Sequence, residues 1–168
     1  MPKAIFRDNM ITLIPYQRFE IKTRFSQNVS LGKIAELVES RELMRSPFAK
    51  DHRLFEGSIE GFSFKISRII HYRNNFLPIL IGQIEDDLDA TSVKITARPN
   101  LVASILIPGL LLAPIFLTIF AVETFDLGLA WLLYAVVYIV IVATFNFELN
   151  KAKKILNEQL ETDKYSSL

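Results

Sequence analysis

Two long apolar runs dominate the second half of the chain. Leu101–Val122 and Leu127–Phe145 contain no charged residue, and only the four-residue link Glu123–Asp126 separates them. A helix of about 20 apolar residues crosses a hydrocarbon core. So short a link forces the second helix back beside the first. The pattern therefore predicts a transmembrane hairpin over residues 101–147, with spans at 101–122 and 127–147.

Before these runs, apolar and polar residues alternate in short stretches. Phe19, Ile21 and Thr23 are interleaved with charged residues, as in a strand with one buried face. Similar stretches follow at 54–60, 62–72 and 91–98, a near-continuous apolar strand is expected at 76–84, and apolar residues recur at helical spacing over 30–40. Residues 1–100 thus predict a cytoplasmic α+β domain: a small antiparallel sheet of about five strands with a covering helix, and with acidic residues 85–89 as a loop.

The segment after the second run has a helical pattern. Its apolar positions are Leu149, Ala152, Leu156 and Leu160, and no Gly or Pro occurs from Leu129 to the end of the sequence. This stripe indicates an amphipathic helix. We expect the second span to extend into the cytoplasm without a break, and residues 148–168 to pack on the sheet.

Charge and composition narrow the setting. The 168-residue chain has a formal net charge of +1 and no cysteine, which argues against a nucleic-acid partner, a disulfide and a cysteine nucleophile. Arg98 precedes the first apolar run, Lys151, Lys153 and Lys154 follow the second, and the link carries only acids. The positive-inside rule then predicts that both termini of this multi-pass protein are cytoplasmic. Because the chain is bacterial in style, we expect the membrane to be the bacterial inner membrane.

Catalytic and metal-binding patterns are sparse. His52 and His71 are the only histidines, and no metal-ligand spacing surrounds either. Asp86, Asp87 and Asp89 lack the glycine and the distal glutamate of a calcium loop. We therefore expect no catalytic residue, no metal and no cofactor.

Two groups of residues are candidates for interaction. The first is a polar and aromatic loop whose asparagines could equally supply turn geometry; it comprises Tyr72, Arg73, Asn74 and Asn75. The second is an aromatic face of the second span, formed by Trp131, Tyr134 and Tyr138. We expect this face to pack on the first span, with the Tyr138 hydroxyl directed to the Leu110 carbonyl that Pro114 leaves free. Alternatively, Trp131 and Tyr134 face lipid as belt residues.

Part of the sequence resembles a group of small bacterial membrane proteins with two spans after their strands. The resemblance rests on Phe-x-Gly-x-Ile at 55–59, Phe-x-Ile-x-Arg at 64–68, Tyr-Arg-Asn-x-Phe-Leu-Pro at 72–78 and the later Gly82. Asn75 stands where that group has a serine. The resemblance implies the layout of strands followed by two spans, and it implies no activity, substrate or catalytic residue.

These patterns favour a non-enzymatic, membrane-anchored interaction protein or accessory subunit, with membrane lipid and a larger membrane protein complex as partners. One alternative is a module that grips a lipid or another apolar ligand at the membrane surface. Its cavity would be lined by large aromatics, namely Phe19, Phe25, Phe55, Phe62, Phe64 and Phe76. A third possibility is an enzyme whose signature the sequence does not display.

Overall fold

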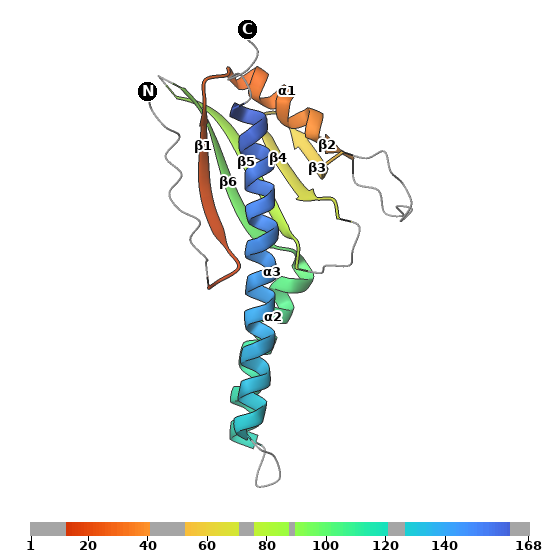
Figure 1. Ribbon diagram of the computed structural model, residues 1–168, viewed down its shortest axis with the longest axis vertical. Coiled ribbons are helices and arrows are strands. Elements are labelled where there is room, and N and C mark those ends of the chain that lie inside the picture. The colour runs from red at the N-terminus through yellow and green to blue at the C-terminus, as the bar shows by residue number, and fades with distance from the viewer. Residues whose placement is uncertain (1–12, 41–52, 71–75, 88–89, 121–126, 162–168) are drawn as a thin grey trace.

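The computed structural model describes residues 13–40, 53–70, 76–87, 90–120 and 127–161. A sheet carries two helices on one face, and the longer of them continues beyond the sheet beside a third helix (Figure 1). In chain order the elements are β1 (Gln17–Thr23), α1 (Gln27–Leu37), β2 (Val38–Glu39), β3 (Phe55–Glu60), β4 (Ser63–Arg68), β5 (Pro78–Asp87), β6 (Ala90–Pro99), α2 (Leu101–Phe120) and α3 (Leu127–Glu161).

The sheet has six strands in the order β1-β6-β5-β4-β3-β2. The prediction of about five antiparallel strands is wrong, because β2 adds a parallel partner to β3, pairing Val38 with Phe55. β2 was hidden in the sequence because it has two residues and follows α1 directly. The sheet is therefore mixed.

The predicted acidic loop is also shorter than expected. Pairing of β5 with β6 continues to Asp87 and Ala90, so the first acidic residues belong to a strand. The Thr91 hydroxyl donates a hydrogen bond to Asp86 Oδ1 at 2.9 Å, which gives one of these carboxylates a partner at the end of the ladder.

Consecutive side chains of a strand point to opposite faces of the sheet, so every second residue of β4 lies in the core, as predicted. Phe64 and Ile66 are buried, whereas Lys65 is exposed. Phe64 pairs with Gly82 of β5. A Cβ atom at Gly82 would lie 2.0 Å from Phe64 Cζ, so the absence of a side chain at Gly82 makes room for the aromatic ring.

The second half of α3 closes the core. Leu149, Ala152, Leu156 and Leu160 are all buried against the sheet, as their spacing predicts. Polar contacts fix the helix at two levels: Lys153 Nζ donates to Gln17 Oε1 at 2.8 Å, and the Thr23 hydroxyl donates to the Leu160 carbonyl at 3.1 Å. The second bond joins the end of β1 to the last described turn of α3.

A buried ion pair links α3 to the sheet at the end where α2 begins. Arg68 Nε of β4 lies 3.0 Å from Glu148 Oε2, and the Glu148 side chain is fully buried. In the ladder, Arg68 follows Ser67, whose partner is Ile79, and Ile79 pairs with Arg98 shortly before α2. The pair therefore lies close to the level at which the chain leaves the sheet.

The helices that follow the sheet contradict the predicted two-helix transmembrane hairpin. Among the described residues, one helix is long and apolar enough to cross a membrane, the Trp131–Glu161 part of α3. Within α2 the described apolar stretch is Leu101–Ala113, and it does not count as a second candidate span. The expected multi-pass arrangement is thus unsupported.

α2 lies beside α3 and begins after Asn100. The side-chain oxygen of Asn100 accepts a hydrogen bond from the Ala103 N–H at 2.8 Å, as in an N-cap.

Candidate membrane-proximal groove

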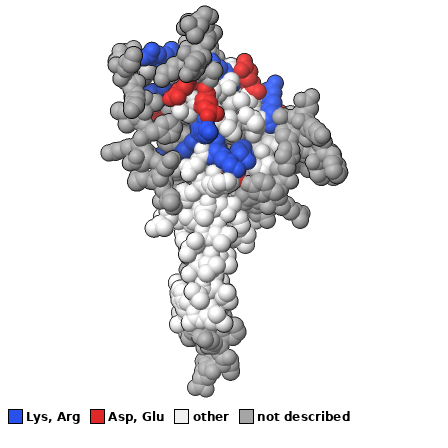
Figure 2. All heavy atoms as spheres, viewed as in Figure 1, with Lys and Arg blue, Asp and Glu red and all other residues white. Residues whose placement is uncertain are grey.

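The part of the molecule that extends beyond the sheet is apolar on its surface. We call it the stalk; it comprises α2 and residues 127–147 of α3, and it contains no Lys, Arg, Asp or Glu. Large apolar side chains are exposed along it, with Ile139 63% and Phe116 62% exposed. Figure 2 shows the same segregation: the stalk is uncharged on the visible face, and basic side chains gather directly above it.

A short turn before β1 lies against the stalk. The Tyr138 hydroxyl donates a hydrogen bond to the Leu13 carbonyl at 2.8 Å, and the Tyr16 N–H donates to the Ile14 carbonyl at 2.7 Å. Pro15 has no N–H to satisfy. Two carbonyls of this turn therefore have protein partners, while the Leu13 and Ile14 side chains are 75% and 70% exposed.

The contact of Tyr138 corrects a prediction. Tyr138 packs against Ala103, Ile107 and Ile141, so its ring does lie at the contact of α3 with α2. Its hydroxyl, however, binds the Leu13 carbonyl and not the Leu110 carbonyl. No sequence pattern indicates this partner, because residues 1–16 have no clear period and Leu13 lies 125 positions away.

A groove of about 450 Å³ lies between this turn and the outward face of α3. Leu13 and Tyr138 bound it at one end, and Ile139, Val142 and Ala143 line its apolar middle. Its other end is lined by Asn146, Phe147 and Asn150. The volume is within the range of about 300–1,000 Å³ that is typical of ligand sites.

Basic side chains of α3 lie just past the polar end of the groove. Lys151 Nζ lies 4.0 Å from the centre of the Phe147 ring, a lining residue. Lys154, one turn after Asn150, is highly exposed, and its Nζ lies 3.8 Å from Glu158 Oε1. An exposed pair at that distance contributes little. The groove is thus apolar along most of its length and ends at Asn150, below two lysines.

The other aromatic candidates have separate places in the structure. Trp131 Nε1 donates to the Thr118 hydroxyl of α2 at 3.2 Å, so this indole contacts the neighbouring helix, although 45% of the side chain is exposed. Tyr134 is half-buried. The loop candidates Tyr72, Arg73, Asn74 and Asn75 lie outside the described residues.

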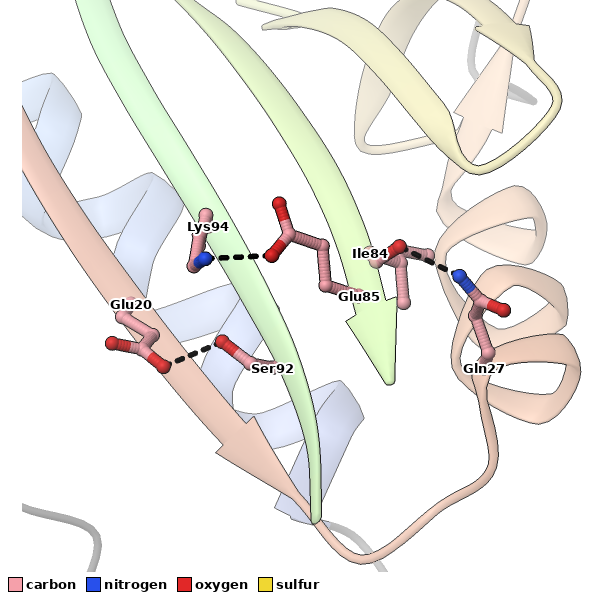
Figure 3. A network of polar contacts seen from close by, with 6 residues as sticks. All are labelled: Glu20, Gln27, Ile84, Glu85, Ser92 and Lys94. Atoms are coloured by element: carbon pink, nitrogen blue, oxygen red, sulfur yellow. Dashed lines mark hydrogen bonds and ion pairs between the residues drawn. The ribbon is translucent and has the colours of Figure 1, made fainter. Parts of the chain in front are cut away.

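The sheet face opposite the helices carries polar side chains towards one end and the half-buried Ile79 and Ile81 of β5 towards the other. Across it, Glu20, Lys94, Gln83, Ser63 and Glu60 occupy one register row, and all five are exposed. Figure 3 shows part of this face, where Lys94 Nζ contacts Glu85 Oε2 at 2.6 Å and the Ser92 hydroxyl donates to Glu20 Oε1 at 2.5 Å. Figure 3 also includes Gln27 at the start of α1, which donates a hydrogen bond to the Ile84 carbonyl at 2.7 Å.

The aromatics considered as cavity lining have several different roles. Phe55 and Phe64 are buried in the core, and Phe19 packs against it. Phe76 packs instead on the Ala103 and Ile107 cluster of the stalk, while Phe62 is exposed. Among the described residues there is no group of three or more His, Asp or Glu side chains that could hold a metal ion.

Comparison with known proteins adds no relative. No protein family matches the chain, and no curated protein or solved structure matches it.

Proposed function

We propose that this chain is a non-enzymatic, membrane-anchored interaction module. In this proposal α3 holds the chain in a bilayer, and the sheet domain lies at the membrane surface, where it meets a larger protein complex as an accessory subunit. The observation that carries the proposal is the charge-free stalk with its exposed apolar side chains. A contiguous apolar surface of this kind is typical of a membrane or protein contact.

The distribution of basic residues supports a cytoplasmic sheet domain. Arg98 comes directly before α2, and Lys151, Lys153 and Lys154 follow the exposed part of α3. Cytoplasmic segments next to membrane helices are enriched in Lys and Arg. For this reason we place the sheet domain on the cytoplasmic side of the membrane, and we propose that this is a bacterial inner membrane.

The polar sheet face supports the interaction role. Its exposed residues carry both charge signs in adjacent strands, as Glu20 and Lys94 do, and such an arrangement can fix the register of a charged partner. The opposite face is filled by the core cluster and by α3. A lipid gripped between sheet and helix is therefore less favoured than a protein partner on the open face.

Alkaline extraction of isolated membranes tests the anchor. We expect the chain to stay in the membrane pellet at high pH and to be released only by detergent, because the stalk replaces water with lipid over its exposed apolar surface. Release of the chain by alkaline buffer alone would refute the anchor.

Native gel electrophoresis after gentle solubilisation tests the accessory-subunit role. We expect the wild-type chain to migrate in a complex larger than itself, and Glu60→Lys, which reverses an exposed charge on the open face, to weaken that complex. Glu161→Lys is the matched control, because Glu161 is exposed at the end of α3, on the helix-covered side. Equal migration of the two variants and the wild type would contradict use of the open face.

A further inference from the structure

The groove beside α3 matches a lipid molecule in its length and in the order of the chemical groups along it. The segment from Tyr138 to Asn150 that lines it rises about 18 Å at 1.5 Å per residue. One leaflet of a hydrocarbon core is about 15 Å thick, half of roughly 30 Å. The groove is thus about as long as an acyl chain in one leaflet.

The chemistry of the lining changes along the same direction. Ile139, Val142 and Ala143 line the apolar part, and Asn150 lies at the polar end. Lys151 and Lys154 follow within about one helical turn. An acyl chain, its ester linkage and a phosphate succeed one another in the same order.

From this match we propose that the groove binds one anionic phospholipid of the bilayer. One acyl chain lies along α3 between Leu13 and Phe147, and the phosphate is held near Lys151 and Lys154. The proposal rests on the membrane anchor proposed above, because only a chain embedded in a bilayer presents the groove to lipid.

The Leu13 turn suits this surrounding. In a hydrocarbon environment, backbone polar groups require partners within the protein. The Leu13 carbonyl has the Tyr138 hydroxyl, and the Ile14 carbonyl has the Tyr16 N–H. The end of the groove at Leu13 can therefore contact an acyl chain through the exposed Leu13 side chain while these two carbonyls remain bonded.

Native mass spectrometry of the full chain tests the site. The protein is purified in mild detergent, equilibrated with equal amounts of phosphatidylglycerol and phosphatidylcholine, and examined for retained lipid. We expect retention of phosphatidylglycerol in preference to phosphatidylcholine. Ala143→Trp, which fills the middle of the groove, should remove most of the retained lipid. Ala135→Trp is the matched control, because Ala135 is exposed on the same helix and does not line the groove.

The lysines are tested by a second variant. Lys151→Gln/Lys154→Gln should reduce the preference for phosphatidylglycerol by roughly fivefold for each lysine. Three results would overturn the proposal: no lipid preference in the wild type, equal lipid loss in Ala143→Trp and Ala135→Trp, or a bound protein in place of lipid. Alkaline extraction of the same membranes separates the two proposals: a chain that stays in the pellet but retains lipid equally in every variant refutes the lipid site alone.

Discussion

Phe64 offers the sharpest test of how the sheet domain is packed. Its side chain is 2% exposed, and its ring occupies the space above Gly82, which has no side chain of its own to fill the gap. Truncation of a buried Phe to Ala costs about 3–5 kcal/mol. We expect Phe64→Ala to lie in the upper part of this range, because neither its cross-strand partner nor the strand backbone can close the cavity.

Thermal unfolding followed by circular dichroism in a fixed detergent measures this loss. For a chain of this size, 1 kcal/mol shifts the Tm by about 2–4 °C, so a loss of about 4–5 kcal/mol in Phe64→Ala should lower the Tm by roughly 8–20 °C. Lys65→Ala is the control on the opposite face of the same strand and should change the stability by less than about 0.5 kcal/mol. Similar losses in both variants would refute the assignment of faces in β4.

The partner of Phe64 permits a double-mutant cycle. Gly82→Ala alone places a Cβ about where the Phe64 ring lies, and overpacking of this kind costs about 1–3 kcal/mol. In the Phe64→Ala background the ring is gone, so the same Gly82→Ala change should cost less or even stabilise. The double variant should therefore be more stable than the sum of the two single changes predicts. Simple additivity of the two losses in stability would show that the ring does not cover Gly82.

Two further variants test the contacts at the base of the sheet. Tyr138→Phe removes the hydrogen bond to the turn before β1 and should cost about 0.6 kcal/mol, the average for such bonds in membrane proteins; hydrogen exchange should quicken in that turn, whereas Tyr134→Phe should leave its rate unchanged. Arg68→Met leaves the buried Glu148 carboxylate without this cation and should cost about 3–5 kcal/mol. Arg98→Met, at an exposed position, should cost little in the same unfolding assay, and equal losses for the two arginines would contradict the role of the ion pair.

The features predictable from the sequence were those with a regular local period. The alternation around Phe64 predicts which face of β4 is buried, and the stripe from Leu149 to Leu160 does the same for α3. The structure buries both faces. β2 was missed because two residues cannot display a period, and its pairing with β3 joins segments on either side of residues 41–52.

The groove could not be predicted for a similar reason. It requires Leu13 to lie beside Tyr138, and neither the polarity nor the spacing of residues 1–16 indicates that contact. The two apolar runs were conspicuous, but hydropathy alone did not show that only α3 provides a candidate span among the described residues. Aromatic residues shared by a helical face predicted the contact of Trp131 and Tyr138 with α2, without identifying the acceptor of the Tyr138 hydroxyl.

α3 belongs at once to the stalk and to the core, and this has a mechanical consequence. Its 35 residues form a rod of about 52 Å, with no Gly or Pro after its first turn to act as a hinge. Tilting or rotating the lower end of the helix therefore moves the sheet with it as one rigid body. One residue inserted after Ala143 would turn the sheet by about 100° relative to the lower rod, so the direction in which the open face looks is set by the number of residues in a single helix.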